Sequence, residues 1–233
     1  TGKRAQDSFR AKVKSMTLSK VNERISKHES ECGRDTGSVV LIAVSKVQPV
    51  EKIEKVLKAG HKDFGENRVQ EASAKWPKLK GKYPKINLHL LGPLQTNKID
   101  QALSVFDVIH SLDREKLAAK LASGIQKIGK DVEMFIQVNF ENEIQKAGIS
   151  VENLDDFVKI CTKKYDLNIS GLMCIPPINK DPEKFFLELK ILAERNGLTK
   201  LSMGMSSDYA QAIRCGSTHV RVGTAIFGSR EKI

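Results

Sequence analysis

Hydrophobic positions along the chain follow two patterns, one typical of buried strands and one typical of amphipathic helices. Runs of consecutive apolar residues, such as residues 40–44, indicate strands that are buried on both faces. Between these runs, apolar residues recur every three or four positions, as in residues 114–129. The first such stretch, residues 10–31, predicts a leading helix. Its apolar face comprises Val13, Met16, Val21 and Ile25.

The patterns predict a regular alternation of strands and helices. Strands are expected at residues 39–45, 62–64, 86–92, 106–111, 132–138, 167–175, 200–204 and 218–223. Helices are expected at residues 50–58, from 67, at 97–103, 114–129 and 151–164, from 182, and at 207–214. Gly60 and Gly216 are expected to end two helices, Asp113 to cap a third, and Pro182 to take the first position of a fourth after Asp181.

This alternation indicates the fold class. Short loops between each strand and the following helix favour parallel pairing with right-handed crossovers. Eight such units after the leading helix predict an α/β protein with a single (β/α)₈ TIM barrel, and an open doubly wound sheet is the alternative. We expect residues 1–35 to form an N-terminal helical extension and residues 36–233 to form the barrel.

Composition narrows the class of protein. No apolar run approaches the roughly 18 residues of a membrane helix, and no apolar segment follows the basic N-terminus, so neither a membrane protein nor a secretory signal is expected. The four cysteines form no C-x-x-C motif and have no histidines at metal-ligand spacing. We therefore expect reduced thiols in a cytoplasmic protein, two of them in the core, and no metal site.

The net charge of +11 raises the possibility of nucleic-acid binding. However, the lysines are spread along the helices, and aromatic residues make up only 6% of the chain. No stacking platform or known nucleic-acid motif accompanies the charge. The sequence therefore favours a lysine-rich solvated surface, and no nucleic-acid partner is expected.

Polar and ionisable residues follow the predicted strands, at the carboxyl ends where barrel enzymes have their active sites. The first strand runs directly into Lys46, and the fourth is expected to end at His110. Each such feature taken alone has a structural explanation: Lys46 as a surface lysine at a strand end, and His89 as a satisfied core histidine. The other endings are "FGEN" (64–67), "HLLGPLQTNK" (89–98), Asn139, "SMGMSS" (202–207) and "RVGTAIFG" (221–228).

The last two strand ends fit a phosphate site, which barrels usually place there. Gly204 permits close approach of the backbone, and Ser206 offers a hydroxyl before the next helix. Gly223 and Thr224 open a short segment whose N–H groups are expected to be exposed to an anion. A lysine together with a phosphate site is what pyridoxal 5'-phosphate requires, since the lysine forms a Schiff base with it.

Six motifs carry a resemblance to a known family. They are "AVSK", "FGEN-x-VQE", "H-x-x-GPLQ-x-NK", "GLM-x-IP", "LSMGMS" and "VR-x-GT-x-IFG". In this order and spacing the sequence resembles the pyridoxal-phosphate homeostasis proteins, which share the fold type III barrel domain of alanine racemase. The match runs from about Val39 to Arg230.

The resemblance implies roles for individual residues. Lys46 would be the Schiff-base lysine, and Arg221 would face the pyridine nitrogen. The other implied contacts are Ser206, Gly223 and Thr224 around the phosphate and Asn67 and Met205 along the pocket. The segment 139–149 keeps the family's Asn139, Glu143, Lys146 and Gly148 but departs from it at Gln145 and Ala147, and Arg68 replaces a frequent aromatic.

Two functions are compatible with this pattern. The resemblance implies a monomeric, cytoplasmic carrier of pyridoxal phosphate that buffers the cofactor or delivers it to apo-enzymes in vitamin B6 homeostasis. The alternative is an amino-acid racemase or another Schiff-base enzyme. Alanine racemase takes a second-face tyrosine from a C-terminal β-domain, which is expected to be absent because the sequence ends at Ile233. The carrier is therefore favoured, and no catalytic residue is assigned.

Overall fold

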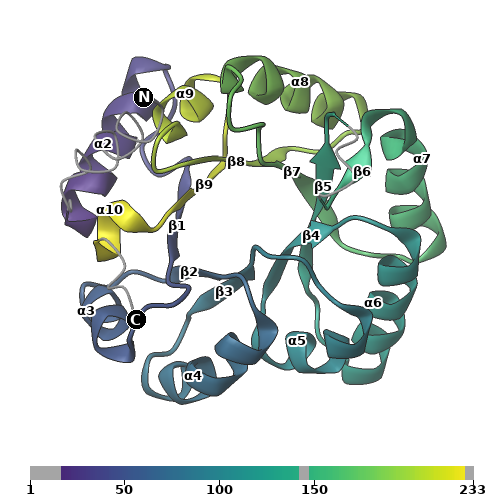
Figure 1. Ribbon diagram of the computed structural model, residues 1–233, viewed down its shortest axis with the longest axis horizontal. Helices are drawn as coiled ribbons and strands as arrows, with labels where there is room; N and C mark the ends of the chain where they lie inside the picture. The colour runs from purple at the N-terminus through teal and green to yellow at the C-terminus, as the bar shows by residue number, and fades with distance from the viewer. Residues whose placement is uncertain (1–16, 142–146, 229–233) are drawn as a thin grey trace, which may run out of the picture.

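The computed structural model describes residues 17–141 and 147–228. In this part of the chain, eight parallel strands close into a barrel surrounded by helices (Figure 1). The strand order is β4-β3-β2-β1-β9-β8-β7-β5, and a β4–β5 pairing completes the ring. The predicted (β/α)₈ barrel is therefore confirmed, and the alternative of an open doubly wound sheet is wrong.

The strands lie close to their predicted positions. The barrel strands are β1 (Val40–Val44), β2 (Asp63–Glu66), β3 (Asn87–Leu90), β4 (Val108–Leu112), β5 (Glu133–Asn139), β7 (Ile169–Cys174), β8 (Lys200–Met205) and β9 (His219–Val222). An additional strand, β6 (Ile149–Ser150), pairs with the last two residues of β5. The sequence did not predict β6, because two residues are too few to produce a periodic pattern.

The helices also follow the predicted alternation. They are α2 (Leu18–Glu31), α3 (Val50–Lys58), α4 (Val69–Lys82), α5 (Ile99–Val105), α6 (Glu115–Ile128), α7 (Leu154–Lys159), α8 (Pro182–Arg195), α9 (Tyr209–Arg214) and α10 (Thr224–Phe227). Short 3₁₀ turns precede α5 (Thr96–Lys98) and α7 (Val151–Asn153), and a π-helical turn (Ile160–Lys164) extends α7.

Three of the four predicted helix boundaries are confirmed, including Gly216, which follows α9 with φ of 98°, and one is wrong. Gly60, with φ of 86°, follows α3 in the left-handed conformation that glycine favours. Asp181 caps α8 by accepting a hydrogen bond from the N–H of Glu183, ahead of Pro182. Asp113 does not cap α6, because its carboxylate pairs with the neighbouring Arg114, which itself occupies the N-cap position.

The leading helix covers the outside of the barrel near β1 and β9 (Figure 1). Val21 and Ile25 on α2 are buried in one cluster with Leu41, Val220 and Val222. The predicted apolar face is thus confirmed for these two residues, while Val13 and Met16 lie outside the described residues. The division into segments 1–35 and 36–233 stays a prediction.

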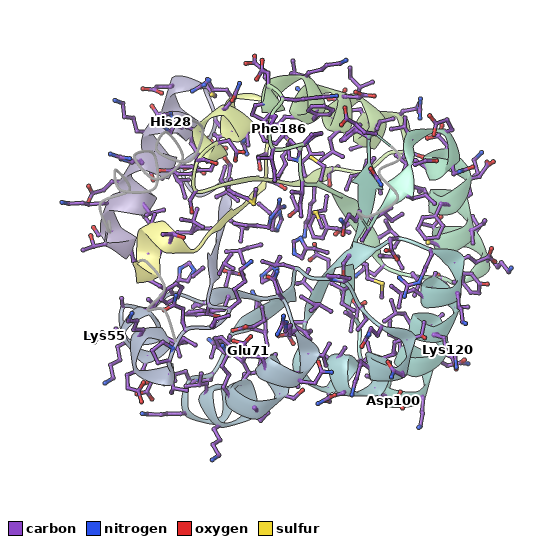
Figure 2. All side chains as sticks on the ribbon, viewed as in Figure 1. His28, Lys55, Glu71, Asp100, Lys120 and Phe186 are labelled. Carbon is purple, nitrogen blue, oxygen red and sulfur yellow. The ribbon has the colours of Figure 1, made fainter. Side chains whose placement is uncertain are left out.

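Side chains fill the space inside the ring of strands (Figure 2). Unlike the apolar layer between strands and helices, this interior contains polar groups. Charged residues such as Lys55 and Lys120 stand on the outer surface instead. The buried interior polar side chains include His89, His110, Ser202, His219 and Arg221.

The cysteines agree in outline with the sequence-based prediction. The four cysteines are free, and three of them, Cys161, Cys174 and Cys215, are buried, one more than expected. Burial raises the pKa of both the Cys161 and the Cys174 thiol to about 12, which makes them inert at neutral pH. Among the described helices, none has the length and apolarity needed to cross a bilayer.

Candidate functional site

The carboxyl ends of parallel strands meet at one face of the barrel, and three neighbouring strands carry most of the predicted site. β9 lies between β8 and β1. Its register pairs Ala43 with Val222, so Gly223 lies beside Val44. A Cβ atom on residue 223 would come 3.1 Å from the carbonyl oxygen of Val44. Lys46 and Thr224 therefore follow adjacent strands at the same edge.

Lys46 is half-buried in a turn that leaves β1. The next residue, Val47, has φ of 60°, a left-handed conformation that is costly for a β-branched side chain. Its N–H donates a hydrogen bond of 2.6 Å to Oε1 of Glu71, on α4. Because Val47 is 58% exposed, burial of its side chain does not account for this conformation. The turn after Lys46 is thus a strained geometry stabilised by a carboxylate.

A buried polar cluster lies beneath this turn. Glu66, at the end of β2, is fully buried and accepts hydrogen bonds at Oε1 from Ser45 Oγ (2.6 Å) and Trp76 Nε1 (3.0 Å). The Lys75 ammonium lies 2.8 Å from the same oxygen. Lys75 also contacts Glu71 at 2.9 Å and the backbone carbonyl of Ser45 at 3.1 Å. The cluster therefore fixes the residue that precedes Lys46.

The electrostatics of this cluster depend on Lys75. Burial raises the pKa of Glu66 above its ordinary value, and the ammonium of Lys75 and three hydrogen bonds oppose that shift only in part. Glu71 is less buried. Although burial would raise the pKa of Glu71, its hydrogen bonds with Lys75 and Val47 hold that pKa below the ordinary value. The Lys75 ammonium thus pairs with both the Glu66 and the Glu71 carboxylates.

The predicted phosphate residues of β8 lie in the turn before α9. Gly204 has φ of 93°, and a Cβ atom there would come 2.5 Å from Cβ of Ala212, so the glycine permits close packing of α9. Ser206 is half-buried in the turn and precedes the N-cap residue, Asp208. Ser206 is therefore not the N-cap of α9. Asp208 Oδ1 accepts a hydrogen bond of 2.6 Å from the N–H of Met205.

The predicted phosphate residues of β9 open the short helix α10. The first intrahelical hydrogen bonds run from Ile226 and Phe227 to the carbonyl of Gly223. The N–H groups of Thr224 and Ala225 precede them and have no partner within the helix. Such groups suit an anion.

Arg221 lies deeper in the barrel, paired across the strands with Ile42, and is only 5% exposed. Its guanidinium donates hydrogen bonds to the carbonyl and hydroxyl oxygens of Ser202 (2.8 and 2.7 Å) and to the carbonyl of Cys174 (2.9 Å). The guanidinium is therefore held by backbone and hydroxyl oxygens of the barrel interior. Burial lowers the pKa of Arg221, yet an arginine stays charged at neutral pH.

Asn67 follows β2, the neighbour of β1, and lines a cavity of about 280 Å³, close to the lower limit for ligand pockets. Of the predicted site residues, Asn67 is the one in its lining, and Met205 is 36% exposed at the end of β8. The cavity lies between the ends of β2, β3, β5 and β7. Its other lining residues are Leu91, Gly92, Pro93, Gln137, Val138, Asn139, Phe140, Glu141, Ala147, Ile175 and Pro177.

The loop after β5 is described only in part. Glu143, Gln145 and Lys146 lie outside the described residues. Gly148 has φ of 131°, and a Cβ atom there would come 2.9 Å from Asn139. Gly148 and Asn139, both kept from the family's pattern, therefore pack closely against each other.

Several residues that shape the site were not found from the sequence. Glu66 and Lys75 were not assigned, although the Glu71–Lys75 spacing of four is typical of a helix-surface ion pair. His110 was expected at a strand end, but it lies in the middle of β4 and is fully buried. Among the described residues, no cluster of histidine, cysteine and acidic side chains could hold a metal ion.

Comparison with known proteins defines the class first. The family model of the alanine racemase N-terminal domain matches residues 18–231. The structure of PipY from Synechococcus elongatus PCC7942 without PLP is 37% identical, covers 89% of this chain and 99% of its own, and superposes with a TM-score of 0.79. Its PLP-bound structure is 36% identical, covers 88% of this chain and 100% of its own, and has a TM-score of 0.76.

The curated relatives then define the family. The pyridoxal phosphate homeostasis protein of Vibrio alginolyticus is 38% identical over 91% of this chain and 95% of its own length. The Escherichia coli K12 protein of the same name is 34% identical over 92% of this chain and 95% of its own. The chain belongs to the pyridoxal phosphate homeostasis protein family, as the six motifs predicted.

Proposed function

We propose that this protein binds pyridoxal phosphate, with Lys46 as the amine that bonds to it, and holds the cofactor for buffering or delivery. One observation carries the proposal. An amine, a pair of backbone N–H groups and a buried guanidinium come from the adjacent strands β1 and β9 at one end of the barrel. PipY, which has a PLP-bound structure, supports it.

The residues present fit the chemistry of this cofactor. When bound, pyridoxal phosphate supplies an aldehyde that condenses with a lysine amine and releases water. Thr224 and Ala225 offer N–H groups to the phosphate, and Ser206 offers a hydroxyl from the neighbouring turn. The bonds of Arg221 use three of its five N–H groups, which leaves two for another acceptor such as a ring nitrogen.

Arg221 favours a carrier over an enzyme. An arginine donates hydrogen bonds and accepts none, so at the ring nitrogen it opposes protonation of that nitrogen. An unprotonated ring withdraws electrons poorly, and amino-acid chemistry on the cofactor depends on that withdrawal.

The tyrosines also favour a carrier. Tyr165 donates its hydroxyl to Glu115 on the outer helix layer at 2.9 Å. Tyr209 is buried beside α2, and Tyr83 ends α4. All three belong to the helix layer outside the barrel, so none of them is placed to serve as the second-face base that racemisation requires.

The wider expectations stay predictions. We expect apo-enzymes that depend on pyridoxal phosphate to receive the cofactor, and we expect a cytoplasmic monomer without a nucleic-acid partner. A racemase or related Schiff-base enzyme remains the alternative.

The test is a titration of cofactor-free protein with pyridoxal phosphate, followed by visible absorbance. Wild type is expected to develop a visible absorbance band from the Schiff base, and so is Lys98→Met, which removes a lysine from another predicted motif. Lys46→Met is expected not to develop this band. The loaded protein is then incubated with L-alanine and, separately, with an apo-enzyme. Transfer of cofactor without turnover supports the carrier, whereas turnover above about 1 s⁻¹, the low end of ordinary enzymes, contradicts it.

A further inference from the structure

A chain of hydrogen bonds crosses the barrel interior from Asp63, near its amino end, to Arg221. Asp63 Oδ1 lies 3.2 Å from His89 Nε2, and His89 Nδ1 lies 2.9 Å from His110 Nε2. His110 Nδ1 lies 2.9 Å from Ser202 Oγ, which accepts from Arg221 at 2.7 Å. The five residues come from β2, β3, β4, β8 and β9.

The donor and acceptor capacities of the two end groups give the chain one direction. Arg221 can only donate, so Ser202 Oγ accepts from it and is free to donate its own proton to His110 Nδ1. His110 then carries its proton on Nε2 and donates to His89 Nδ1. His89 in turn carries its proton on Nε2 and donates to Asp63, whose carboxylate only accepts. Every link is satisfied with both histidines neutral.

The opposite direction leaves a group unsatisfied. If His89 were an imidazolium, it would donate to both Asp63 and His110, and His110 would donate from Nδ1 to Ser202. The Ser202 oxygen would then accept from two sides, and its own proton would have no partner in the chain. Ser202 is fully buried, so that loss would cost free energy.

The surroundings support the neutral chain. Burial, followed by the nearby His89 and His219, lowers the pKa of His110 well below its ordinary value. Although burial would raise the pKa of Asp63, the hydrogen bond from His89 holds it below the ordinary value, so Asp63 is a carboxylate. His110 also stacks on Phe135 with ring centroids 4.3 Å apart, which fixes its ring plane.

We infer that Asp63, His89, His110 and Ser202 are positioning residues that orient the Arg221 guanidinium through a one-directional chain of hydrogen bonds. The chain cannot act as a proton wire, because Arg221 does not release a proton at neutral pH. The consequence for the cofactor rests on the proposed function, since it requires Arg221 to meet the ring nitrogen. The chain of hydrogen bonds itself does not depend on contact between Arg221 and the cofactor.

The first test measures the histidine tautomers by long-range ¹H–¹⁵N NMR in the cofactor-free protein, with assignments from single-histidine substitutions. Both His89 and His110 are expected to be neutral and protonated at Nε2. A proton on Nδ1 of His110, or an imidazolium at His89, would overturn the inference.

The second test breaks the chain at its centre. In Ser202→Ala, exchange of the Arg221 guanidinium protons with solvent is expected to accelerate about tenfold, the equivalent of one hydrogen bond donated by a charged group. Ser217→Ala is the matched control, since Ser217 is equally buried and donates to backbone carbonyls outside the chain. His110→Phe, with His219→Phe as its control, repeats the comparison if Ser202→Ala folds poorly. Equal exchange rates in variant and control would overturn the inference.

A third measurement separates this inference from the proposed function. Ser202→Ala is expected to bind pyridoxal phosphate about fivefold more weakly, and Ser217→Ala within twofold of wild type. If exchange accelerates but neither Ser202→Ala nor Arg221→Met changes the affinity, the chain stands. The proposed place of Arg221 at the cofactor would then be wrong.

Discussion

Removal of the Lys75 ammonium should destabilise the protein in a pH-dependent way. Lys75 lies 2.8 Å from Glu66, whose side chain is fully buried, and Lys75 itself is 10% exposed. Loss of one partner from such a buried pair costs about 3–5 kcal/mol. We expect Lys75→Met to lower the free energy of unfolding by about 3 kcal/mol at pH 8, because Glu66 keeps its hydrogen bonds from Ser45 and Trp76.

The pH dependence follows from the raised pKa of Glu66, which loss of the cation raises further. Below about pH 4 both the folded and the unfolded carboxyl are protonated, and the missing ammonium costs little. Above that pH the unfolded chain releases its proton and the folded protein retains it. The variant therefore loses about 1.4 kcal/mol per pH unit as pH rises, up to the folded pKa.

The assay is urea unfolding at pH 5 and pH 8, with two comparisons. Lys78→Met removes an exposed lysine from the same helix and should change stability little at either pH. The double variant Glu66→Gln with Lys75→Met should recover stability at pH 8, because the amide needs no counter-charge. If Lys75→Met matched Lys78→Met, or lost more stability at pH 5 than at pH 8, the account of this cluster would be refuted.

Three further predictions concern the anion site, the turn after Lys46 and the barrel interior. Ser206→Ala should weaken binding of pyridoxal phosphate by about 1.5–3 kcal/mol and barely change that of unphosphorylated pyridoxal, measured by titration; equal losses would show that Ser206 does not contact the phosphate. Val47→Gly should change the free energy of unfolding by less than about 0.5 kcal/mol, because relief of the left-handed strain offsets the chain entropy of glycine, whereas Val50→Gly in α3 should cost about 1 kcal/mol. Burial lowers the pKa of His219 to about 3, so stability should fall by about 1.4 kcal/mol per pH unit as pH drops below 6.5, and His219→Phe should reduce this slope in acid unfolding curves; an unchanged slope would contradict it.

The fold was predictable because its signals are local and repeat. Each strand is a short apolar run, and turn or cap residues such as Gly60 and Asp181 mark where helices end or begin. The missed strand β6 has two residues, too few for any period. The Asp113 cap failed because Arg114 competes for the same carboxylate, a contact that a propensity rule does not consider.

The site was predictable only in part, for a different physical reason. Residues that follow strands, such as Lys46 and Thr224, must meet at one end of a parallel barrel, so their position in the sequence suffices. The supporting groups come from positions far apart in the sequence, and only the strand register brings them together. His110 and Ser202 are 92 residues apart, yet their side chains are 2.9 Å apart. A single sequence contains no signal for that pairing.

We propose Lys46 as the residue that bonds to pyridoxal phosphate. The most direct test of this proposal is borohydride reduction of the loaded protein, followed by proteolysis and mass spectrometry of the labelled peptide. One reduced cofactor is expected, on the peptide that contains residue 46. Reduced cofactor on Lys98 or Lys146, with residue 46 unmodified, would contradict it.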